Sequence, residues 1–438
     1  MASTSSSSAL EASQEPPQAL TPNSELLAAE AATEKPPDDS SKLRMFLGIL
    51  RKFIGVKDIA SVRFSLPAQL LEPTPNLEYW TYLDRPETFT AIGDSDEPLD
   101  RMLEVLRFWF TKDLKYVKGK PCKPYNSTLG EFFRCNWEVT EAAPSIATLR
   151  AAAPSSSKSS VKSTASTSPK STDEPIRVSF LTEQTSHHPP SQPSTSRTSI
   201  KVTPGEHNLG IFITLHKRDD EQYQLTHPAA HLGGLLRGGL SVSVGDQCYT
   251  TCPKTRTKTI LHYHEEGWLG KAQNRVEGVV FKYDPEKDDK VRIADVPEKD
   301  VLARITGNWK EKVFVSVAPN FKVQIPLIDL TPLELVPKIL PPVPSQLPNE
   351  SLRYWAGVTD AIRARQFGRA TVLKTEIEER QRRKAREREE GGVEWSPRFF
   401  VGSVTPLGRP ELTEDGEEAL RRLERGEWEI EESLVTAS

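Results

Sequence analysis

The chain has 438 residues, of which 36% are hydrophobic and 27% are charged, and its formal net charge is −4. This length suits one large domain with tails, or two small domains. The nearly neutral balance gives no overall field that would favour a nucleic acid, so we expect no nucleic-acid partner.

The four cysteines, few for a chain of this size, are typical of a reducing compartment. The N-terminus lacks the basic start and apolar stretch of a signal peptide. No run approaches the ~18 apolar residues that a membrane-spanning helix needs. We therefore expect a soluble, cytosolic protein that meets membranes only peripherally.

Residues 1–41 are rich in Ser, Ala, Pro and Glu and are expected to form a disordered tail. An apolar set with helical spacing follows and includes Phe46, Leu47 and Leu50. One interpretation is a short helix that packs on the core. The other is a mobile amphipathic lid, which covers an apolar ligand in one state and touches a membrane in the other.

The next apolar segment, from Pro98 to Lys115, is expected to be a buried helix with the proline in its first turn. Residues 123–131 follow as Lys-Pro-Tyr-Asn-Ser-Thr-Leu-Gly-Glu. Lys123 supplies a compact positive charge and Asn126 both a donor and an acceptor, so the pair suits a phosphate or another polar head group. The alternative is a solvated turn. Residues 141–174 are of low complexity and are expected to be a disordered insertion.

Two adjacent histidines stand in the octet Glu183–Pro190, which reads Glu-Gln-Thr-Ser-His-His-Pro-Pro. The first proline holds His188 extended, and the β-rich run Ile176–Leu181 comes before the octet. The motif is thus expected where a strand ends in a rigid turn, a common place for binding groups. The alternative is an ordinary surface turn.

From Ile211 onwards the sequence predicts short strands without intervening helices, which favours an antiparallel sheet or barrel. The predicted strands are Ile211–Leu215, Tyr223–Leu225, Leu240–Val244, Thr259–Tyr263, Val276–Tyr283, Leu302–Ile305 and Val313–Val317. The glycine pairs at 233–234 and 238–239 precede a strand rather than a helix, so they do not fit a phosphate-binding loop. His262, His264 and Cys248 lack a further spaced ligand, and we predict no metal site.

A proline-rich linker at residues 332–348 leads to a predicted helix from about Ala356 to Glu390. Lys374, Glu378 and Arg382 follow i, i+4, i+8 spacing and share one face of this helix. The simplest interpretation is a charged, solvated helix. Residues 401–438 are expected to form an acidic tail, amphipathic over 411–432.

The octet as a whole resembles the signature of the oxysterol-binding-protein-related family, the Osh homologues of fungi, with Thr185 where valine is usual. Three further segments resemble this family in its order: Leu66–Pro73, Lys123–Glu131 (with Ser127 in place of a second proline) and Lys374–Arg382. The resemblance covers about residues 42–400, apart from the insertion and a gap after Pro190.

The resemblance implies an α+β domain over 42–400, with an antiparallel β-barrel-like lipid tunnel, an N-terminal helical lid, C-terminal helices and disordered tails. It places Leu71, with the lid, against the lipid tails. The implied head-group residues are Lys123, Asn126, His187, His188, Lys374, Glu378 and Arg382. Relatives continue after Pro190 into two strands, and about 20 residues are missing here. That loss is expected to leave an unpaired sheet edge.

The implied function is lipid transfer: phosphatidylinositol 4-phosphate would be exchanged for a sterol or phosphatidylserine between membranes, with no cofactor and no catalytic residue. The expected partners are membrane surfaces, met transiently by a monomer at contact sites of the endoplasmic reticulum, Golgi or plasma membrane. Two alternatives stay open. One is a lipid-bound sensor or scaffold without net transfer, and the other is a metal-dependent hydrolase built on His187 and His188.

Overall fold

The computed structural model describes Ser41, Met45 and residues 68–119, 123–151, 171–185, 191–195, 200–204, 208–233, 241–265, 273–401 and 411–430. Ser41 and Met45 are helical. The predicted lid residues Phe46, Leu47 and Leu50 lie outside the described residues, so the choice between a lid and a core-packing helix stays open.

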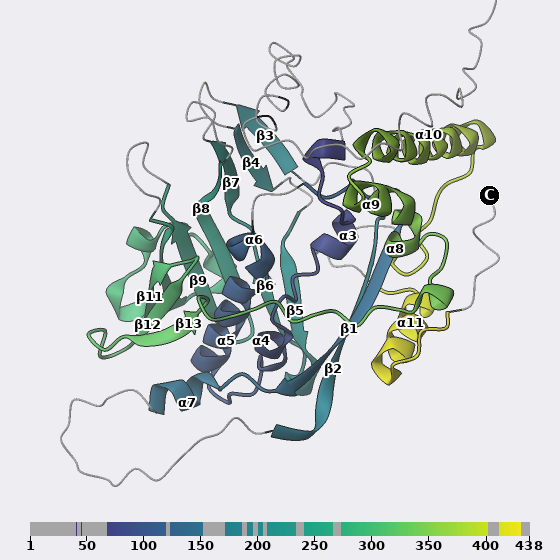
Figure 1. Cartoon of the computed structure of the whole chain (residues 1–438). Coiled ribbons are helices and arrows are strands. Elements are labelled where there is room, and N and C mark those ends of the chain that lie inside the picture. Colours follow the sequence, from purple (N-terminus) through teal and green to yellow (C-terminus); the bar gives the residue numbers. More distant parts are fainter. Residues whose placement is uncertain are drawn as a thin grey trace, which may run out of the picture.

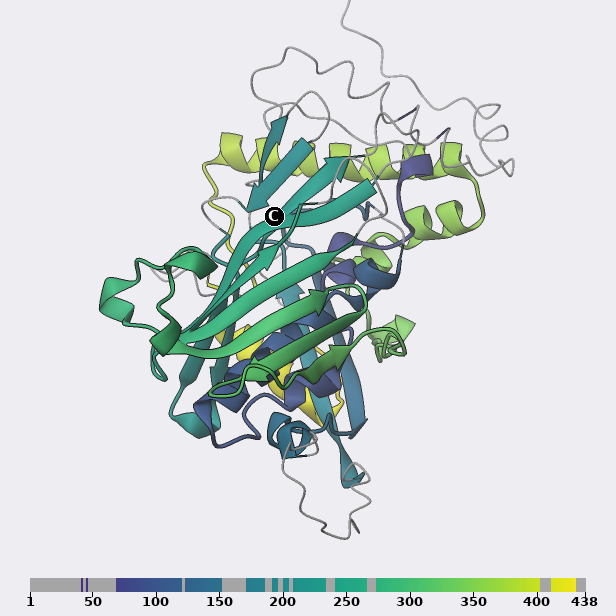
Figure 2. The same ribbon diagram turned by 90° about the vertical axis from the view of Figure 1, so that its left-hand side faces the viewer.

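The largest element is an antiparallel, 11-stranded sheet, shown in Figures 1 and 2. Its main path runs β13-β12-β11-β10-β9-β8-β7-β4-β3, while β5 pairs with β6 and β6 with β8. The strands are β3 (Ser191–Thr195), β4 (Ile200–Pro204), β5 (Ile211–Leu215), β6 (Glu221–Leu225), β7 (Ala229–Gly233), β8 (Ser241–Cys252), β9 (Thr257–Tyr263), β10 (Arg275–Lys282), β11 (Val301–Asn308), β12 (Lys312–Val317) and β13 (Ile325–Asp329).

Within the described residues this sheet is an open path, with β3 and β13 at its two ends. Ser191 begins β3 directly after the octet, and β3 forms a hairpin with β4. In the described part of the chain β3 pairs only with β4, so it is an edge strand, as β13 is at the other end of the path. That residues are missing after Pro190 stays a prediction, since the hairpin of β3 and β4 follows the octet directly. The strong curvature of the sheet agrees with a tunnel-like fold, although the described strands do not close into a barrel.

A second, two-stranded sheet joins β1 (Phe132–Glu141) to β2 (Ser171–Glu183). Strand β1 was not predicted from the sequence, and its first six residues are all buried. The structure also differs from the predicted insertion 141–174 at both ends. Residues Ile146–Ala151 form helix α7, anchored by the buried Ile146, and β2 already begins at Ser171. The centre of the insertion, 152–170, lies outside the described residues.

The N-terminal helices pack against the sheet, as Figure 2 shows with the purple and blue helices behind the green strands. They are α3 (Asn76–Tyr79), α4 (Pro86–Thr90), α5 (Pro98–Thr111) and α6 (Leu114–Lys118). Helix α5 has Pro98 in its first turn and is buried along almost its whole length. Its apolar residues share one core with strands β9 to β12. Across this interface, Trp109 donates a hydrogen bond to the Tyr263 hydroxyl at 2.9 Å.

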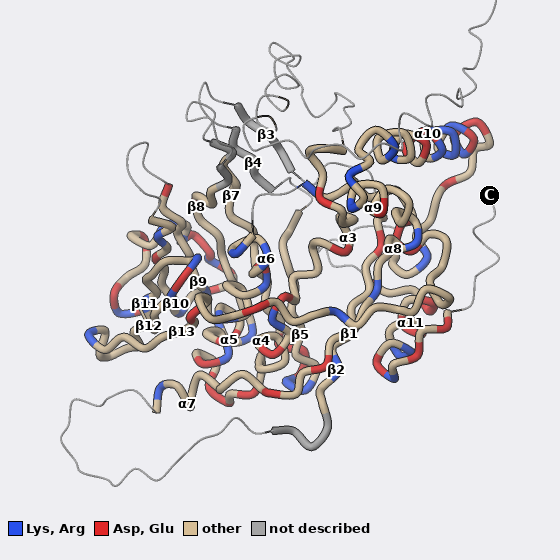
Figure 3. The backbone as a smooth tube through the Cα atoms, in the orientation of Figure 1, with Lys and Arg blue, Asp and Glu red and all other residues tan. Residues whose placement is uncertain are grey.

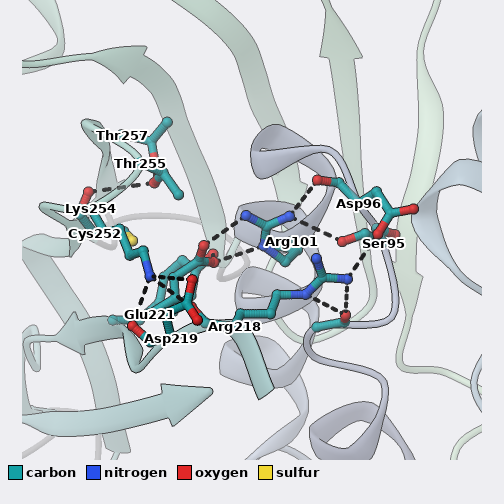
Figure 4. A network of polar contacts seen from close by, with 12 residues as sticks. Ser95, Asp96, Arg101, Arg218, Asp219, Glu221, Cys252, Lys254, Thr255 and Thr257 are labelled. Atoms are coloured by element: carbon teal, nitrogen blue, oxygen red, sulfur yellow. Dashed lines mark hydrogen bonds and ion pairs between the residues drawn. The ribbon is translucent and has the colours of Figure 1, made fainter. Parts of the chain in front are cut away.

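A buried ion pair fixes α5 against β6, as Figure 4 shows. The guanidinium of Arg101 donates two hydrogen bonds of 2.7 Å to the two carboxylate oxygens of Glu221. Tyr223 donates a third hydrogen bond to this carboxylate, at 2.6 Å. Burial alone would raise the pKa of Glu221, but the hydrogen bonds from Arg101 and Tyr223 lower it overall. The pair is therefore ionised at neutral pH and holds the helix at one position along the sheet.

The C-terminal helices are α8 (Ser351–Tyr354), α9 (Ala356–Arg363), α10 (Phe367–Gly391) and α11 (Glu414–Arg425). The predicted single helix 356–390 is broken between α9 and α10, where Arg365 has a positive φ of 58°. Short 3-10 turns complete the described elements: η1 (Ala68–Leu70), η2 (His216–Arg218), η4 (Pro285–Lys287), η5 (Ile293–Asp295), η6 (Glu298–Asp300) and η7 (Val343–Ser345). Among the described helices, none is long and apolar enough to cross a bilayer.

Helix α11 shows that the predicted acidic tail 401–438 contains a docked element, which lies beside β1 and β2 in Figure 1. Its Ala419 and Leu423 are fully buried in a cluster with Phe132, Leu181 and Phe399. From β1, Arg134 donates a hydrogen bond to the carbonyl of Trp428 at 2.6 Å, and Asn136 donates one to the carbonyl of Leu423 at 2.8 Å. Part of the predicted tail is thus integral to the domain.

Candidate functional site

The candidate site is built on a small apolar cluster that joins η1 to α9 and α10. Leu71 and Ala68 are buried there with Tyr125, Trp355, Phe367 and Ile377. The backbone N–H of Ala68 lies 3.5 Å from the Thr371 hydroxyl on α10. Leu71, which we expected to touch lipid tails, is in contact with this protein cluster, and its contact with lipid stays a prediction.

The Lys123 segment lies alongside the chain that follows η1. The N–H of Glu72 donates to the Lys123 carbonyl at 3.0 Å, and the N–H of Tyr125 donates to the Thr74 carbonyl at 3.3 Å. Tyr125 is fully buried, with its ring 5.0 Å from that of Trp355. The buried tyrosine anchors this segment to the core. Lys123 and Asn126, which flank it in the sequence, are exposed. The Lys123 ammonium donates to the Asn126 side-chain oxygen at 2.7 Å.

The three predicted residues of α10 do meet on one face of the helix. The Lys374 ammonium donates a hydrogen bond of 2.6 Å to Glu378, whose other oxygen lies 3.6 Å from Arg382 Nη2. Lys374 is almost buried, with 6% of its side chain exposed, whereas Arg382 is 46% exposed. The face therefore runs from a buried cation to a solvent-accessible one. Figure 3 shows further Lys and Arg residues along the outer half of α10.

Lys123 and Lys374 come from segments far apart in the sequence, and the charge of Lys374 reaches the Lys123 ammonium. Although the Lys123 side chain reaches the surface, protein atoms packed around its ammonium lower its pKa by desolvation, and the positive charge of Lys374 lowers it further. Glu378 neutralises Lys374, while within the described residues Lys123 has an amide oxygen but no carboxylate as its partner. An anion placed between these two ammonium groups would relieve their repulsion, so the geometry suits a phosphate.

The octet begins beside this site. Gly130, at the end of the Lys123 segment, donates its N–H to the Gln184 carbonyl at 3.0 Å, and Gln184 donates its own N–H to the Glu131 carbonyl at 2.8 Å. Two of the predicted motifs are thus adjacent in space. His187 and His188, three and four residues further along the chain, lie outside the described residues, so their contacts are not part of this geometry.

Two carboxylates for which the sequence carries no functional signal hold these motifs together: Glu131, which is buried, and Glu183, which is half-buried. Glu183 accepts hydrogen bonds from the N–H groups of Arg398 and Phe399, both at 2.8 Å. Glu131 accepts from the N–H of Thr128 at 2.9 Å, the Ser351 hydroxyl at 2.6 Å and the Trp355 indole at 3.0 Å.

Burial raises the pKa of both Glu183 and Glu131, and these hydrogen bonds partly oppose that rise. Each carboxylate sits at an end of the small sheet, since β1 begins at Phe132, directly after Glu131, and β2 ends at Glu183. An acidic residue at the boundary of an apolar strand was the only signal in the sequence, and many solvated turns share it.

The structure also shows whether Cys248, His262 and His264 lie close together. Cys248 is buried in the main core, beside α5, whereas His262 alternates with the core residues Leu261 and Tyr263 and so faces the other side of the sheet. The rings of His262 and His264 lie 4.7 Å apart, edge to face. Cys248 therefore lies on the opposite face of the sheet from the two histidines. The predicted strand after the glycine pairs is β8, which begins at Ser241.

Comparison with known proteins extends this picture. The family model described as "Oxysterol-binding protein" matches residues 45–355. The "Oxysterol-binding protein-like protein 1" of Schizosaccharomyces pombe is 39% identical over 507 aligned positions, which cover 93% of this chain and 98% of that protein. The mouse "Oxysterol-binding protein-related protein 9" is 27% identical over 76% of this chain, but only 44% of its own length is covered.

Two solved structures have a similar fold. One is the Osh1 ORD domain in complex with cholesterol, with a TM-score of 0.58 over 91% of this chain and 96% of that one. The other is the Osh3 ORD of Saccharomyces cerevisiae in complex with PI(4)P, with a TM-score of 0.55 over 91% and 95%. Both are 15% identical, so they show the fold alone.

The family match spans well over half of the sequence, and the S. pombe relative is similar along nearly its whole length. Lipid-binding and lipid-transfer proteins, not enzymes, make up this family. The chain belongs to the oxysterol-binding protein family.

Proposed function

We propose that this protein exchanges phosphatidylinositol 4-phosphate for a sterol between membranes, with each lipid held tail-in beneath the Lys123–Lys374 site. The observation that carries the proposal is the face of α10 on which Lys374, Glu378 and Arg382 meet, with Lys374 near enough to Lys123 to add to the effect of burial on its pKa. The ammonium groups of Lys123 and Lys374 and the guanidinium of Arg382 together favour a ligand with more than one negative charge. A phosphoinositide head group meets that requirement.

Each polar side chain of the site has a role in this proposal. Lys123 and Lys374 bind phosphate oxygens as point charges, and the more exposed Arg382 binds a phosphate with two parallel hydrogen bonds. Glu378, which contacts both Lys374 and Arg382, orients the two cations or accepts from an inositol hydroxyl. His187 and His188 donate to the same phosphates, from the end of the octet that begins beside Gly130.

The lipid tails determine whether such exchange is possible. Removing an acyl chain or a sterol from water releases about 0.8 kcal/mol per CH₂ group. The protein must therefore offer an apolar space in which the lipid is as stable as it is in the bilayer. Similar folds that hold cholesterol and PI(4)P support a sterol and a phosphoinositide as the two ligands. Phosphatidylserine is the alternative second lipid. Contact sites between the endoplasmic reticulum and the Golgi or plasma membrane are the proposed place of action.

Extraction from liposomes tests the proposal. The purified full chain is mixed with vesicles that carry labelled phosphatidylinositol 4-phosphate, dehydroergosterol or phosphatidylserine, and the lipid in the supernatant is measured. We expect stoichiometric uptake of the phosphoinositide and of dehydroergosterol, and faster sterol movement between two vesicle populations when the acceptor holds the phosphoinositide.

The outcomes separate the alternatives. Uptake of phosphatidylserine in place of dehydroergosterol would change the second lipid. Binding of lipid without acceleration of transfer would identify a sensor or scaffold. No uptake of any lipid by folded protein would overturn the proposal, and the edge strand β3 would then be the place to look for a lost tunnel wall.

A further inference from the structure

A group of possible metal ligands lies on the main sheet, outside the site described above. His231 is on β7, Asp246 is on β8, and Glu265 follows β9 by two residues. One donor atom from each of the three lies within 4.8 Å of the other two. Since β7, β8 and β9 are consecutive in the sheet, the group spans three neighbouring strands.

The local backbone explains how these residues meet. His231 is the register partner of Ser243, and Asp246 that of Tyr263. Asp246 has a positive φ of 68°, an uncommon conformation for a residue within a strand. Side chains normally alternate between the two faces of a sheet, and a left-handed residue changes that alternation locally. The turn at Asp246 thus allows its carboxylate to lie beside the imidazole of His231.

The imidazole provides the first sign that a ligand is required. The Nε2 atom of His231 is inaccessible to solvent and has no hydrogen-bond partner within the described part of the chain. A buried polar atom without a partner is uncommon in folded proteins, because it loses its hydrogen bond to water and gains nothing in return. A metal ion bound to this nitrogen would supply the missing interaction.

Gly245 provides the second sign. A Cβ atom at this position would lie 2.8 Å from His231 Nε2 and 3.6 Å from the Glu265 Cγ atom. The first distance is shorter than a van der Waals contact, so any other residue would displace the imidazole. The glycine therefore leaves open the space in which the histidine nitrogen and the stem of the glutamate come together.

The donor types indicate which ion fits. Donor atoms around one Zn²⁺ ion are about 3.4 Å apart, given metal–ligand distances of about 2.1 Å. The observed spread of up to 4.8 Å can close by rotation of the exposed Glu265 side chain. One imidazole with two carboxylates suits Zn²⁺, Mn²⁺ or Co²⁺, whereas Ca²⁺ and Mg²⁺ prefer oxygen alone. The two carboxylates also balance the charge of a divalent ion.

We infer that His231, Asp246 and Glu265 form a binding site for a divalent transition-metal ion of the Zn²⁺ class. The bound ion ties β7 to β9 across β8. It thereby restrains β7, the centre of β8 and the residues that directly follow β9. The inference does not depend on the lipid exchange proposed above.

Metal binding by the full chain tests this inference. Protein treated with a chelator is titrated with ZnCl₂ in a calorimeter, and with CoCl₂ while the visible absorption of Co²⁺ is followed. We expect one equivalent to bind. His231→Ala should weaken binding at least tenfold, and Glu265→Gln, which changes an exposed side chain and leaves the fold intact, should weaken it several-fold.

His216→Ala is the matched control. Its imidazole lies 2.7 Å from the Asp220 carboxylate, but this is an exposed pair with no third ligand in the group. The control should bind Co²⁺ as the unchanged protein does. The inference is overturned if the unchanged protein binds no equivalent of either ion, or if neither His231→Ala nor Glu265→Gln weakens the binding.

Discussion

Lys374 on α10 lies near enough to Lys123 for its positive charge to add to the effect of burial in lowering the pKa of the Lys123 ammonium, although the two lysines belong to segments at opposite ends of the domain. Repulsion between neighbouring ammonium groups opposes folding. This arrangement is understandable if an anion occupies the space between them.

Lys123→Ala should therefore weaken the extraction of phosphatidylinositol 4-phosphate by tenfold or more, since a hydrogen bond to a charged group contributes about 1.5–3 kcal/mol. Sterol extraction should not change. The measurement is uptake from liposomes over a range of protein concentrations. Lys384→Ala, an exposed lysine further along α10, is the control. Equal losses for both variants would mean that only general surface charge matters.

The double variant His187→Ala, His188→Ala should abolish phosphoinositide extraction while the protein stays folded, because the octet starts next to the Lys123 segment through Gln184. Circular dichroism and thermal unfolding check the fold, and His216→Ala serves as an exposed histidine control. Extraction that survives in the double variant would remove the histidine pair from the proposed site.

Glu131→Ala should lower the free energy of unfolding by about 3 kcal/mol, because the Ser351 hydroxyl and the Trp355 indole would be left buried without an acceptor. Unfolding in urea measures the change. Glu379→Ala, an exposed glutamate on α10, should change stability by less than about 0.5 kcal/mol. A loss at Glu131 no larger than at Glu379 would show that the three hydrogen bonds contribute little.

The pH dependence of stability should also change at Glu131. Its pKa in the folded protein is raised above the ordinary value of 4.5, mainly by burial. Between 4.5 and the raised value the folded state binds more protons than the unfolded state, so stability increases as the pH falls through that window. Relative to Glu131→Gln, the unchanged protein should thus gain stability as the pH falls from 7 towards 4.5. A difference that stays constant with pH would contradict the raised pKa.

Phe46→Asp with Leu50→Asp should reduce binding to vesicles at least tenfold if residues 43–54 act as a lid, since each large apolar side chain contributes about 1.5–3 kcal/mol on burial in a membrane. Vesicle flotation measures the binding. Leu26→Asp with Leu27→Asp, in the predicted disordered tail, is the matched control. Unchanged binding together with a lower unfolding temperature would favour a core-packing helix.

The sequence predicts those elements whose pattern is local. The β-branched run Val313–Val317 becomes β12, and the spacing of Lys374, Glu378 and Arg382 places them on one face of α10. In these segments the repeat of side-chain character, every two residues in a strand or every 3.6 residues in a helix, is sufficient to predict the element. No contact with a distant segment is needed.

Other features depend on contacts that no local pattern contains. The predicted strand Leu240–Val244 stops before Gly245, yet β8 continues through Gly245 and Asp246 to Cys252, because β7 and β9 pair with it on its two sides. Helix α11 is highly acidic and reads as a solvated tail, but Ala419 and Leu423 form a narrow apolar stripe that fits Phe132 and Phe399. The pairing of Glu183 with Arg398 and Phe399 likewise depends on segments that are distant in the sequence.

The position of α11 affects the order in which the domain can assemble during synthesis. Arg134 on β1 has a fully buried side chain, and its hydrogen-bond acceptors are Glu350 and the carbonyls of Ser345 and Trp428. All three residues leave the ribosome long after β1. In a nascent chain the Arg134 guanidinium is hydrated, and it can be buried without loss of hydrogen bonds only when residues 345–430 have emerged. The packed state of β1 therefore depends on the last part of the chain to be synthesised.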